Sequence, residues 1–372
     1  MHIMQLANFH GPRSGGIRVA LDELAQRYVA AGHRCTLVVP GESDRAGGTH
    51  DRPVYHVGAP IIPGLGGYRM ILDRRAVRAA IEADPPDVIE LSDKTTLLGV
   101  SHRVRVSGTP IVLISHERLD AVVTSVMGDH RPVRAAVRRL NRRVSDRVDA
   151  IVTASRFAAD EFDVMACPPI HHIPLGVDLR RFCPSEHHRY SSAGARRLVS
   201  VVRLSPEKRP DLVVETVRRL HESGCRVHLD LLGDGPLREQ LEGDSEGLPV
   251  TFHAHVDDRE TVAHHLREAD VALAPGPSET FGLAALEALA SGTPVVVPTT
   301  GALPELITPG VGLVADPTPA SFTGAVRRVL TWDRDRVRRE ARTYAERFSW
   351  DVTSESMLRL FDRVRSDERA AA

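Results

Sequence analysis

The chain has 372 residues, a length that predicts about two domains. Hydrophobic residues make up 42% and charged residues 26%, which excludes a collagen-like, disordered or disulfide-dense chain. The formal net charge of −1 provides no broad basic field of the kind that attracts nucleic acid, so we expect no nucleic-acid partner.

The chain carries no sign of a membrane-spanning or exported protein. Its first residues lack a basic segment and a long apolar core, so we expect no signal peptide. No apolar run approaches the roughly 18–20 residues that cross a bilayer. We therefore expect a cytoplasmic protein, and peripheral contact with the inner face of the membrane stays open.

Short apolar runs alternate with longer helical patterns, which predicts βαβ units on parallel sheets. The predicted strands lie at 2–9, 35–39, 87–92, 110–116, 149–154, 197–203, 226–233, 250–253, 270–274 and 294–297. The predicted helices lie at 17–31, 133–148, 210–221, 236–242, 259–268 and 281–291, and the tail at 333–369 reads as one continuous helix. A polar stretch at 183–196 predicts a linker between two doubly wound domains.

The strongest candidate site is the segment 278–292, which follows a predicted strand. Glu279 precedes a predicted helix, whose first N–H groups can hold a phosphate. Glu287 falls within that apolar helix, where a carboxylate is costly unless a partner such as a ribose diol hydrogen-bonds it. The alternative is that Glu279 caps the helix and that Glu287 pairs with an internal arginine.

A second candidate site follows the strand predicted at 197–203. Arg203 and Lys208 are two cations across a turn, and strand carboxyl ends are where ligands bind in open α/β sheets. Together they could clamp a diphosphate. Lys208 and Lys94 are the only lysines among 48 basic residues, which singles Lys208 out. The alternative is a solvated turn.

Two weaker candidates lie in the first half of the chain. Gly15 and Gly16 follow the first predicted strand, where glycines let the backbone approach an anion, although a tight turn explains them equally well. His116 ends the strand predicted at 110–116, at an edge that favours ligand binding, but a lone histidine is more often structural.

The sequence predicts no metal site. The histidine pairs and the H-x-H at His253 lack H-E-x-x-H spacing or cysteine partners, so we interpret them as surface or core residues. Asp333 and Asp335 resemble a D-x-D metal motif, but a solvated helix face is the simpler interpretation.

One predicted helix is strongly basic. Residues 131–147 hold seven arginines and one aspartate, with valines and a leucine at helical spacing. The usual interpretation is a docked surface helix, and the alternative is contact with anionic lipid. The arginines that would make this contact are Arg131, Arg134, Arg138 and Arg142.

Taken together, these motifs resemble the retaining GT-B glycosyltransferases of family GT4. The resemblance lies in the order and spacing of Glu279-x7-Glu287, Arg203 with Lys208, the Gly15-Gly16 turn and His116, together with Phe281-Gly282 and the Phe348-Ser-Trp350-Asp tail. Within the family, residues 8–16, 114–120 and 274–287 most resemble actinobacterial GDP-mannose-dependent α-mannosyltransferases that act on phosphatidylinositol mannosides.

The resemblance implies a fold of two doubly wound parallel-sheet domains that face each other across a cleft. Residues 1–178 would form the acceptor-side domain and residues 179–350 the nucleotide-sugar domain. Residues 351–372 would form a helix that returns to the N-terminal domain. It also implies a metal-independent hexosyltransferase with a nucleotide-sugar donor, most closely GDP-mannose, and no cofactor.

The resemblance also assigns roles to residues. The implied catalytic residues are His116, Glu279, Arg203 and Lys208. The implied donor-binding residues are Gly15, Gly16, Val256, Asp258, Phe281, Gly282, Leu283 and Glu287, with Asp258 reading the guanine base. The acceptor would contact Tyr68 and Arg69. Retention could proceed by front-face attack or through a covalent intermediate.

Three other functions stay open on the sequence alone. One is the same enzyme acting on a soluble acceptor, such as an antibiotic or thiol precursor, with a GDP- or UDP-sugar. Another is a sugar-nucleotide epimerase, which shares the fold. The last is a non-catalytic nucleotide-binding protein on the same fold. The acceptor, the linkage position and the oligomeric state are not predicted.

Overall fold

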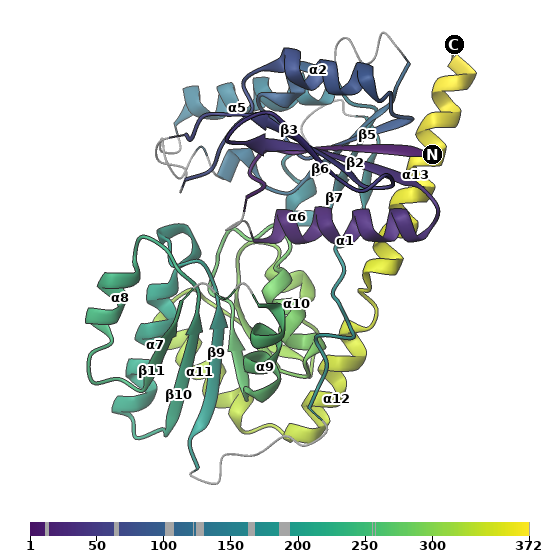
Figure 1. Cartoon of the computed structure of the whole chain (residues 1–372). Coiled ribbons are helices and arrows are strands. Elements are labelled where there is room, and N and C mark those ends of the chain that lie inside the picture. Colours follow the sequence, from purple (N-terminus) through teal and green to yellow (C-terminus); the bar gives the residue numbers. More distant parts are fainter. Residues whose placement is uncertain are drawn as a thin grey trace. The chain divides into compact units, whose positions relative to one another are not determined.

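The computed structural model describes all residues except 12–14, 63–66, 101–107, 122, 124–129, 163–167, 186–193, 255, 257 and 372. The chain divides into two compact units (Figure 1). Unit 1 comprises Met1–Leu175 and Trp350–Ala372, and unit 2 comprises Gly176–Ser349. The sequence analysis places the corresponding boundaries after residues 178 and 350.

The described part of unit 1 is built on an eight-stranded sheet in the order β3-β4-β2-β1-β5-β6-β7-β8. Its strands are β1 (His2–Leu6), β2 (Arg34–Gly41), β3 (Arg45–Gly48), β4 (Pro53–Gly58), β5 (Val88–Leu91), β6 (Ile111–Ser115), β7 (Ala150–Thr153) and β8 (Ile170–His172). All neighbours pair in parallel except β3 and β4. The strand order reverses between β1 and β5, which is where open α/β sheets bind ligands.

Helices cover the sheet of unit 1. They are α1 (Gly16–Ala30), α2 (Arg74–Ala83), η1 (Leu97–Val100), α5 (Arg131–Ser145), α6 (Arg156–Ala159) and α13 (Trp350–Ala371). The C-terminal helix α13 crosses α1 and packs against it, and the fully buried rings of Tyr28 and Phe361 meet edge to face at 5.8 Å (Figure 1). The last helix of the chain is therefore part of the core that the first residues build.

Unit 2 has a six-stranded parallel sheet in its described residues, in the order β11-β10-β9-β12-β13-β14. The strands are β9 (Arg196–Val201), β10 (Val227–Leu232), β11 (Val250–His253), β12 (Val271–Leu273), β13 (Val295–Pro298) and β14 (Gly312–Ala315). The chain moves outward from β9 to β11 and then returns to β12 on the other side of β9. The carboxyl ends of β9 and β12 therefore flank the reversal point.

Helices also cover the sheet of unit 2. They are η2 (Pro206–Lys208), α7 (Pro210–Glu222), α8 (Arg238–Asp244), α9 (Arg259–Glu268), α10 (Leu283–Ala290), η3 (Leu303–Leu306), α11 (Pro319–Leu330) and α12 (Arg334–Ala345). The core between helices and sheet is aliphatic, with fully buried side chains such as Leu198, Leu229 and Val296 from the strands and Val217 and Phe322 from the helices. This packing fixes the strand ends that carry the candidate site.

The prediction of one continuous helix over 333–369 is wrong, because α12 ends at Ala345 and α13 begins at Trp350. Phe348 N donates to Ala345 O, which closes the last turn of α12. Phe348 O then accepts from Val177 N at 2.9 Å, and Ser349 forms a bridge with Val177. The backbone between the two helices is thus paired with a distant segment, which a local helical pattern does not reveal. Asp333 accepts from Arg336 N and caps α12.

Candidate active site

The segment after β9 and the segment after β12 meet at the reversal point of the unit 2 sheet. Backbone bonds from Val202 N to Leu232 O and from Leu204 N to Asp234 O hold the first segment in place. Gly233, at φ +151°, lies so close that a Cβ would approach Val202 O within 1.9 Å. Glycine is required there, and the close packing fixes the backbone that carries exposed Arg203.

Lys208 and Glu279 join these two segments. Lys208 Nζ donates to Glu279 Oε1 at 2.7 Å, and the side chains are 30% and 28% exposed. Lys208 lies on η2, where its N–H donates to Ser205 O. The backbone at Glu279 is fixed by a hydrogen bond in which Ala302 N donates to Glu279 O at 2.8 Å. The structure thus brings together two residues that lie 71 positions apart in the sequence.

The helix that follows Glu279 begins without a side-chain cap. Gly282, at φ +95°, is the N-cap of α10, and a Cβ there would lie 2.2 Å from Leu303 Cδ2. Phe281 is buried beside it, and Leu283 opens the helix. A helix N-terminus with this geometry carries partial positive charge and suits a phosphate. The helix starts two residues later than the sequence predicts.

Glu287 lies inside α10 with its side chain 5% exposed, and it forms an ion pair with Arg259 Nη2. Arg259 opens α9, and its guanidinium lies 5.0 Å from the centre of the Phe182 ring. The pairing with an arginine that the sequence analysis named as an alternative is therefore present. Nothing in the local pattern of 278–292 identifies Arg259 as the partner, because it comes from another helix.

The expected base-reading loop lies between β11 and α9. The Asp258 carboxylate caps α9, because it accepts from the backbone N–H groups of Glu260 and Thr261 at 3.1 Å each. Val256 is half-buried. The other two members of the predicted motif, residues 255 and 257, lie outside the described residues. Binding of guanine by Asp258 stays a prediction.

His116 lies in unit 1, directly after β6. Its Nε2 lies 3.1 Å from Ser92 Oγ, at the end of the neighbouring strand β5. Burial and the nearby Lys94 ammonium lower the pKa of His116 to about 4. The imidazole is therefore neutral at pH 7, in which state it can both donate and accept a hydrogen bond.

Lys94, beside His116, lies in a buried network that the sequence analysis did not foresee. Its side chain is 7% exposed, and its ammonium is paired with the buried Glu161 side chain and donates to Glu117 O at 2.6 Å. The second oxygen of Glu161 accepts from Leu119 N at 2.8 Å and from Asn141 Nδ2 at 3.1 Å. Burial lowers the pKa of Lys94 against the opposing effect of Glu161. The sequence signal that could have pointed to Lys94 was that the chain has only two lysines.

The first β–α turn is described only in part, because residues 12–14 lie outside the described residues. Gly15 is the exposed N-cap of α1, and Gly16 opens the helix, with no side-chain hydrogen bond capping it. A Cβ at Gly15 would meet nothing within 4 Å in the described structure. Binding of an anion by Gly15 and Gly16 stays a prediction.

The expected acceptor residues lie near the carboxyl side of β4. The Tyr68 ring meets Phe9 edge to face at 5.8 Å. Arg69 donates to Ala59 O at 2.8 Å, and its guanidinium lies 3.3 Å from Glu42 Oε1. Arg69 is therefore engaged within unit 1, and contact with an acceptor stays a prediction.

Helix α5 presents an arginine-rich face to solvent. Val137 and Val144 are buried on its inner side. The exposed arginines of the helix are Arg131, Arg134, Arg138, Arg139, Arg142 and Arg143. Within the described chain, no helix is long and apolar enough to cross a membrane.

Comparison with known proteins identifies the class. Residues 14–181 match the family described as Glycosyltransferase Family 4, and residues 195–331 match the family described as Glycosyl transferases group 1. The chain is 40% identical to the GDP-mannose-dependent alpha-(1-6)-phosphatidylinositol dimannoside mannosyltransferase of Mycobacterium tuberculosis strain H37Ra, over 96% of this chain and 95% of the relative.

Solved structures share the fold. Sucrose-phosphate synthase from Thermosynechococcus elongatus superposes with a TM-score of 0.82 at 19% identity, over 98% of this chain and 99% of that chain. Anabaena Alr3699/HepE in complex with UDP and glucose superposes with a TM-score of 0.75 at 18% identity, over 97% and 99% of the two chains. The two parallel-sheet units are those of a GT-B enzyme. The chain belongs to glycosyltransferase family 4, and it is a hexosyltransferase.

Proposed function

We propose that this enzyme transfers mannose from GDP-mannose to a phosphatidylinositol mannoside lipid, with retention at the anomeric carbon and without a metal ion. The activity for which the mycobacterial relative is named supports this donor and acceptor, at 40% identity over nearly the whole chain. The observation that carries the chemistry is the Lys208–Glu279 pair at the reversal point of the unit 2 sheet.

Breaking the bond between sugar and phosphate leaves negative charge on the departing GDP. Lys208 and Arg203 would neutralise this charge, and the first N–H groups of α10, around Phe281, Gly282 and Leu283, would bind the distal phosphate. Positive charge fixed in advance needs little reorganisation when the leaving group forms. These groups supply the role that a divalent cation has in other transferases, which supports metal independence.

Glu279 would face the hydroxyls of the donor sugar. Its bond to Lys208 holds one carboxylate oxygen near the expected phosphate position. The sugar ring gains positive charge as the bond breaks, and a neighbouring carboxylate stabilises that charge. Neutral His116 would hydrogen-bond a sugar hydroxyl, with Ser92 orienting its ring.

Glu287 would bind the ribose diol, with Arg259 paired to its buried carboxylate. Asp258 and Val256 would contact the guanine, and Gly15 with Gly16 would approach the diphosphate. A carboxylate has about four acceptor positions, and Asp258 uses three of them for Glu260 N, Thr261 N and Thr261 Oγ1, which leaves about one for a base.

The exposed arginine face of α5 would hold the enzyme at a membrane that contains its lipid acceptor. Arg131, Arg134, Arg138 and Arg142 lie on that face, and each basic side chain near an anionic surface contributes about 1 kcal/mol. Tyr68 and Arg69 would contact the acceptor headgroup. The enzyme would then act at the cytoplasmic face.

The test is a transfer assay with GDP-mannose and two acceptors, phosphatidylinositol dimannoside in anionic vesicles and a water-soluble inositol derivative. We expect mannosylation of the lipid, an α-linked product by NMR and full activity in EDTA. Transfer to the soluble acceptor alone would overturn the lipid assignment. Activity that EDTA abolishes and Mg²⁺ restores would overturn metal independence.

The same vesicles test the role of α5. We expect Arg134→Glu/Arg138→Glu/Arg142→Glu to lose co-sedimentation with anionic vesicles. The matched control is Arg218→Glu/Arg219→Glu on helix α7, which removes two arginines from another helix and should leave vesicle binding unchanged. Equal vesicle binding by the α5 variant and the wild type would remove this helix from the proposal.

A further inference from the structure

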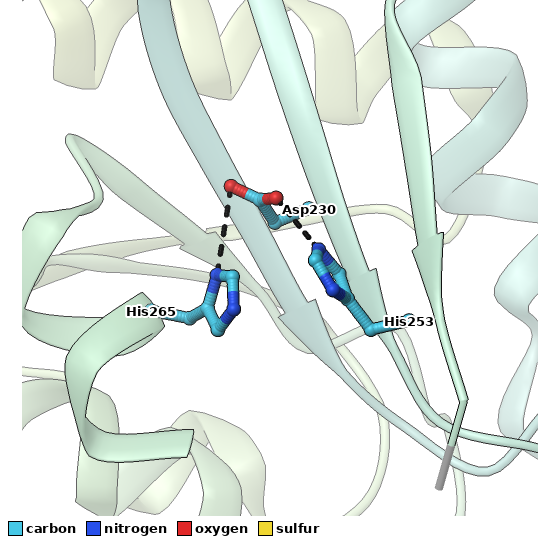
Figure 2. A group of neighbouring side chains, drawn as sticks. All are labelled: Asp230, His253 and His265. Atoms are coloured by element: carbon cyan, nitrogen blue, oxygen red, sulfur yellow. Dashed lines mark hydrogen bonds and ion pairs between the residues drawn. The ribbon is translucent and has the colours of Figure 1, made fainter. Parts of the chain in front are cut away.

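Three side chains with metal-ligand atoms converge in unit 2 from three different elements. Asp230 comes from β10, His253 ends β11 and His265 lies in α9 (Figure 2). Their ligand atoms all lie within 4.8 Å of one another. His253 Nε2 donates to Asp230 Oδ1 at 2.8 Å, and the two imidazole rings lie 4.4 Å apart between centroids.

The cluster contains a buried polar atom that its surroundings do not satisfy. His265 Nδ1 lies 3.7 Å from Asp230 Oδ2, too far for a hydrogen bond, and it finds no hydrogen-bond partner in the part of the chain that the structure describes. A buried nitrogen without a hydrogen-bond partner is costly, and such atoms are uncommon unless they have a role. Figure 2 shows this nitrogen pointing to the Asp230 carboxylate.

Asp230 supplies the negative charge. It is 7% exposed, and its carboxylate faces both imidazoles. Burial alone would raise the pKa of the Asp230 carboxyl, but the two histidines outweigh burial and hold the pKa well below its usual range. A carboxylate oxygen beside two imidazole nitrogens is a common set of metal-ligand atoms.

We propose that Asp230, His253 and His265 form a site for a divalent transition metal, with Zn²⁺ as the best match. Zn²⁺ is commonly held by imidazole nitrogens and a carboxylate oxygen at about 2.0–2.2 Å, which places neighbouring ligand atoms about 3.3 Å apart. The separations of 2.8 Å from His253 Nε2 to Asp230 Oδ1 and of 3.7 Å from His265 Nδ1 to Asp230 Oδ2 bracket that value. A water molecule would complete a tetrahedron.

One further charge faces the cluster. Arg197 Nη2 lies 3.7 Å from Asp230 Oδ2, and Arg197 Nη1 lies 3.9 Å from Glu268 Oε2. The Arg197 side chain is 38% exposed, so it can turn toward Glu268 when a metal takes the Asp230 oxygen.

The site would have a structural role. His253 ends β11 and His265 lies in α9, so the metal would tie the two elements on either side of the loop 254–258 to β10. The transfer chemistry does not run through it, and this inference stands independently of the donor and acceptor proposed above.

The experiment is Zn²⁺ titration by calorimetry on chelator-treated full-length enzyme, with a phosphine reductant to keep the cysteines reduced. We expect one equivalent to bind at micromolar or tighter affinity and to raise the melting temperature by several degrees. His265→Gln should weaken this binding at least 100-fold. The matched control His264→Gln, on an exposed side chain one position earlier in α9, should keep it.

A second variant shows whether loss of Zn²⁺ binding comes from loss of a ligand or from misfolding. His253→Gln removes a different ligand, and circular dichroism of each variant without metal must match the wild type. Absence of stoichiometric Zn²⁺ binding by the wild type would overturn the proposal. It would equally be overturned if His265→Gln and His253→Gln, both folded, bound Zn²⁺ as tightly as His264→Gln.

Discussion

Both lysines of this arginine-rich chain are paired with a glutamate, but the two pairs differ in burial. Lys94 and Glu161 are buried, and their attraction offsets the cost of removing both charges from water. The Lys94 charge of this pair lies near His116. Lys208 and Glu279 are each about 30% exposed. An ion pair with that exposure contributes roughly 0–1 kcal/mol to folding, so stability alone does not explain it. The proposed function gives Lys208 a ligand-binding role, which substitution of the lysine tests.

Replacing Lys208 by Ala should therefore cost activity without costing stability. We expect turnover to fall by about 10²-fold or more, as for loss of other groups that stabilise a developing charge, with the melting temperature nearly unchanged. Arg203→Ala should behave similarly. The matched control is Arg209→Ala, which removes a neighbouring exposed cation that is paired with Asp211. If Lys208→Ala and Arg203→Ala both had wild-type kinetics, the proposed role of these residues in binding the diphosphate would be wrong.

The two glutamates should separate binding from chemistry. Glu287 is assigned to the ribose, which is alike in substrate and transition state, so Glu287→Gln should raise KM and weaken donor affinity. Glu279 is assigned to the sugar, whose charge changes as the bond breaks, so Glu279→Gln should lower kcat. Calorimetry gives the affinity and initial rates give the turnover.

The alternative for these glutamates is purely structural. If both variants lowered only the melting temperature, the Arg259–Glu287 pair and the Lys208–Glu279 pair would serve folding rather than donor binding. Intact affinity in Glu287→Gln, or intact turnover in Glu279→Gln, would contradict the corresponding role.

His116 should make the protein sensitive to acid. Its pKa is lowered to about 4 in the folded state, against about 6.5 when unfolded, so the unfolded state binds more protons between these values. Its contribution to stability is complete above pH 6.5 and is lost as the pH falls toward 4, by about 1–2 kcal/mol at pH 5. Denaturant unfolding at pH 7 and at pH 5 measures this loss of unfolding free energy.

The comparison is made between two histidine variants. His116→Gln should lose less stability between pH 7 and pH 5 than the wild type, whereas the exposed His264→Gln should lose as much as the wild type. An unchanged pH dependence in His116→Gln would show that the imidazole is not buried in its neutral form.

At the scale of elements, the start of α10 depends on one glycine. Gly282→Ala places a Cβ at a positive φ and within 2.2 Å of Leu303 Cδ2, so we expect a loss of about 2 kcal/mol or more in unfolding free energy and weaker donor binding. The control is Gly324→Ala in α11, where a Cβ meets nothing within 4 Å and alanine should be neutral or stabilising. Equal stability of the two variants would contradict this account.

The elements with strong local signals were predictable from the sequence. Strand β11 and helix α9 have the predicted bounds, because the β-forming residues Val250-Thr-Phe lead to His253 and the Asp258 cap then starts an amphipathic helix. Four of the described strands, β3, β4, β8 and β14, were not predicted. All four residues of β3 are exposed, and its pairing depends on β4 rather than on its own pattern.

The candidate site was predictable only as separate segments. Motif spacing identified Lys208 and Glu279, but their contact depends on the order of β9 and β12 in the sheet. Arg259 and the cluster of Asp230, His253 and His265 were missed for the same reason. Their side chains come from elements that only the fold brings together.

At the scale of the molecule, the two units hold different parts of the proposed chemistry. Unit 2 holds the groups assigned to the nucleotide and its phosphates, Lys208, Glu279 and Glu287, whereas unit 1 holds His116. The chain leaves unit 1 after Leu175 and returns at Trp350, so the core of unit 1 is complete only when the last helix is present. Both ends of the chain therefore contribute to one functional unit.

The central claim is that unit 2 binds GDP-mannose. The most direct measurement is the binding of GDP-mannose, UDP-glucose and ADP-glucose to the full-length enzyme by calorimetry, with thermal unfolding in parallel. We expect GDP-mannose to bind at least ten-fold tighter than the other two and, at about 100 times its Kd, to stabilise the protein by roughly 2.7 kcal/mol. Tighter binding of the UDP- or ADP-sugar, or no binding of GDP-mannose, would contradict the account.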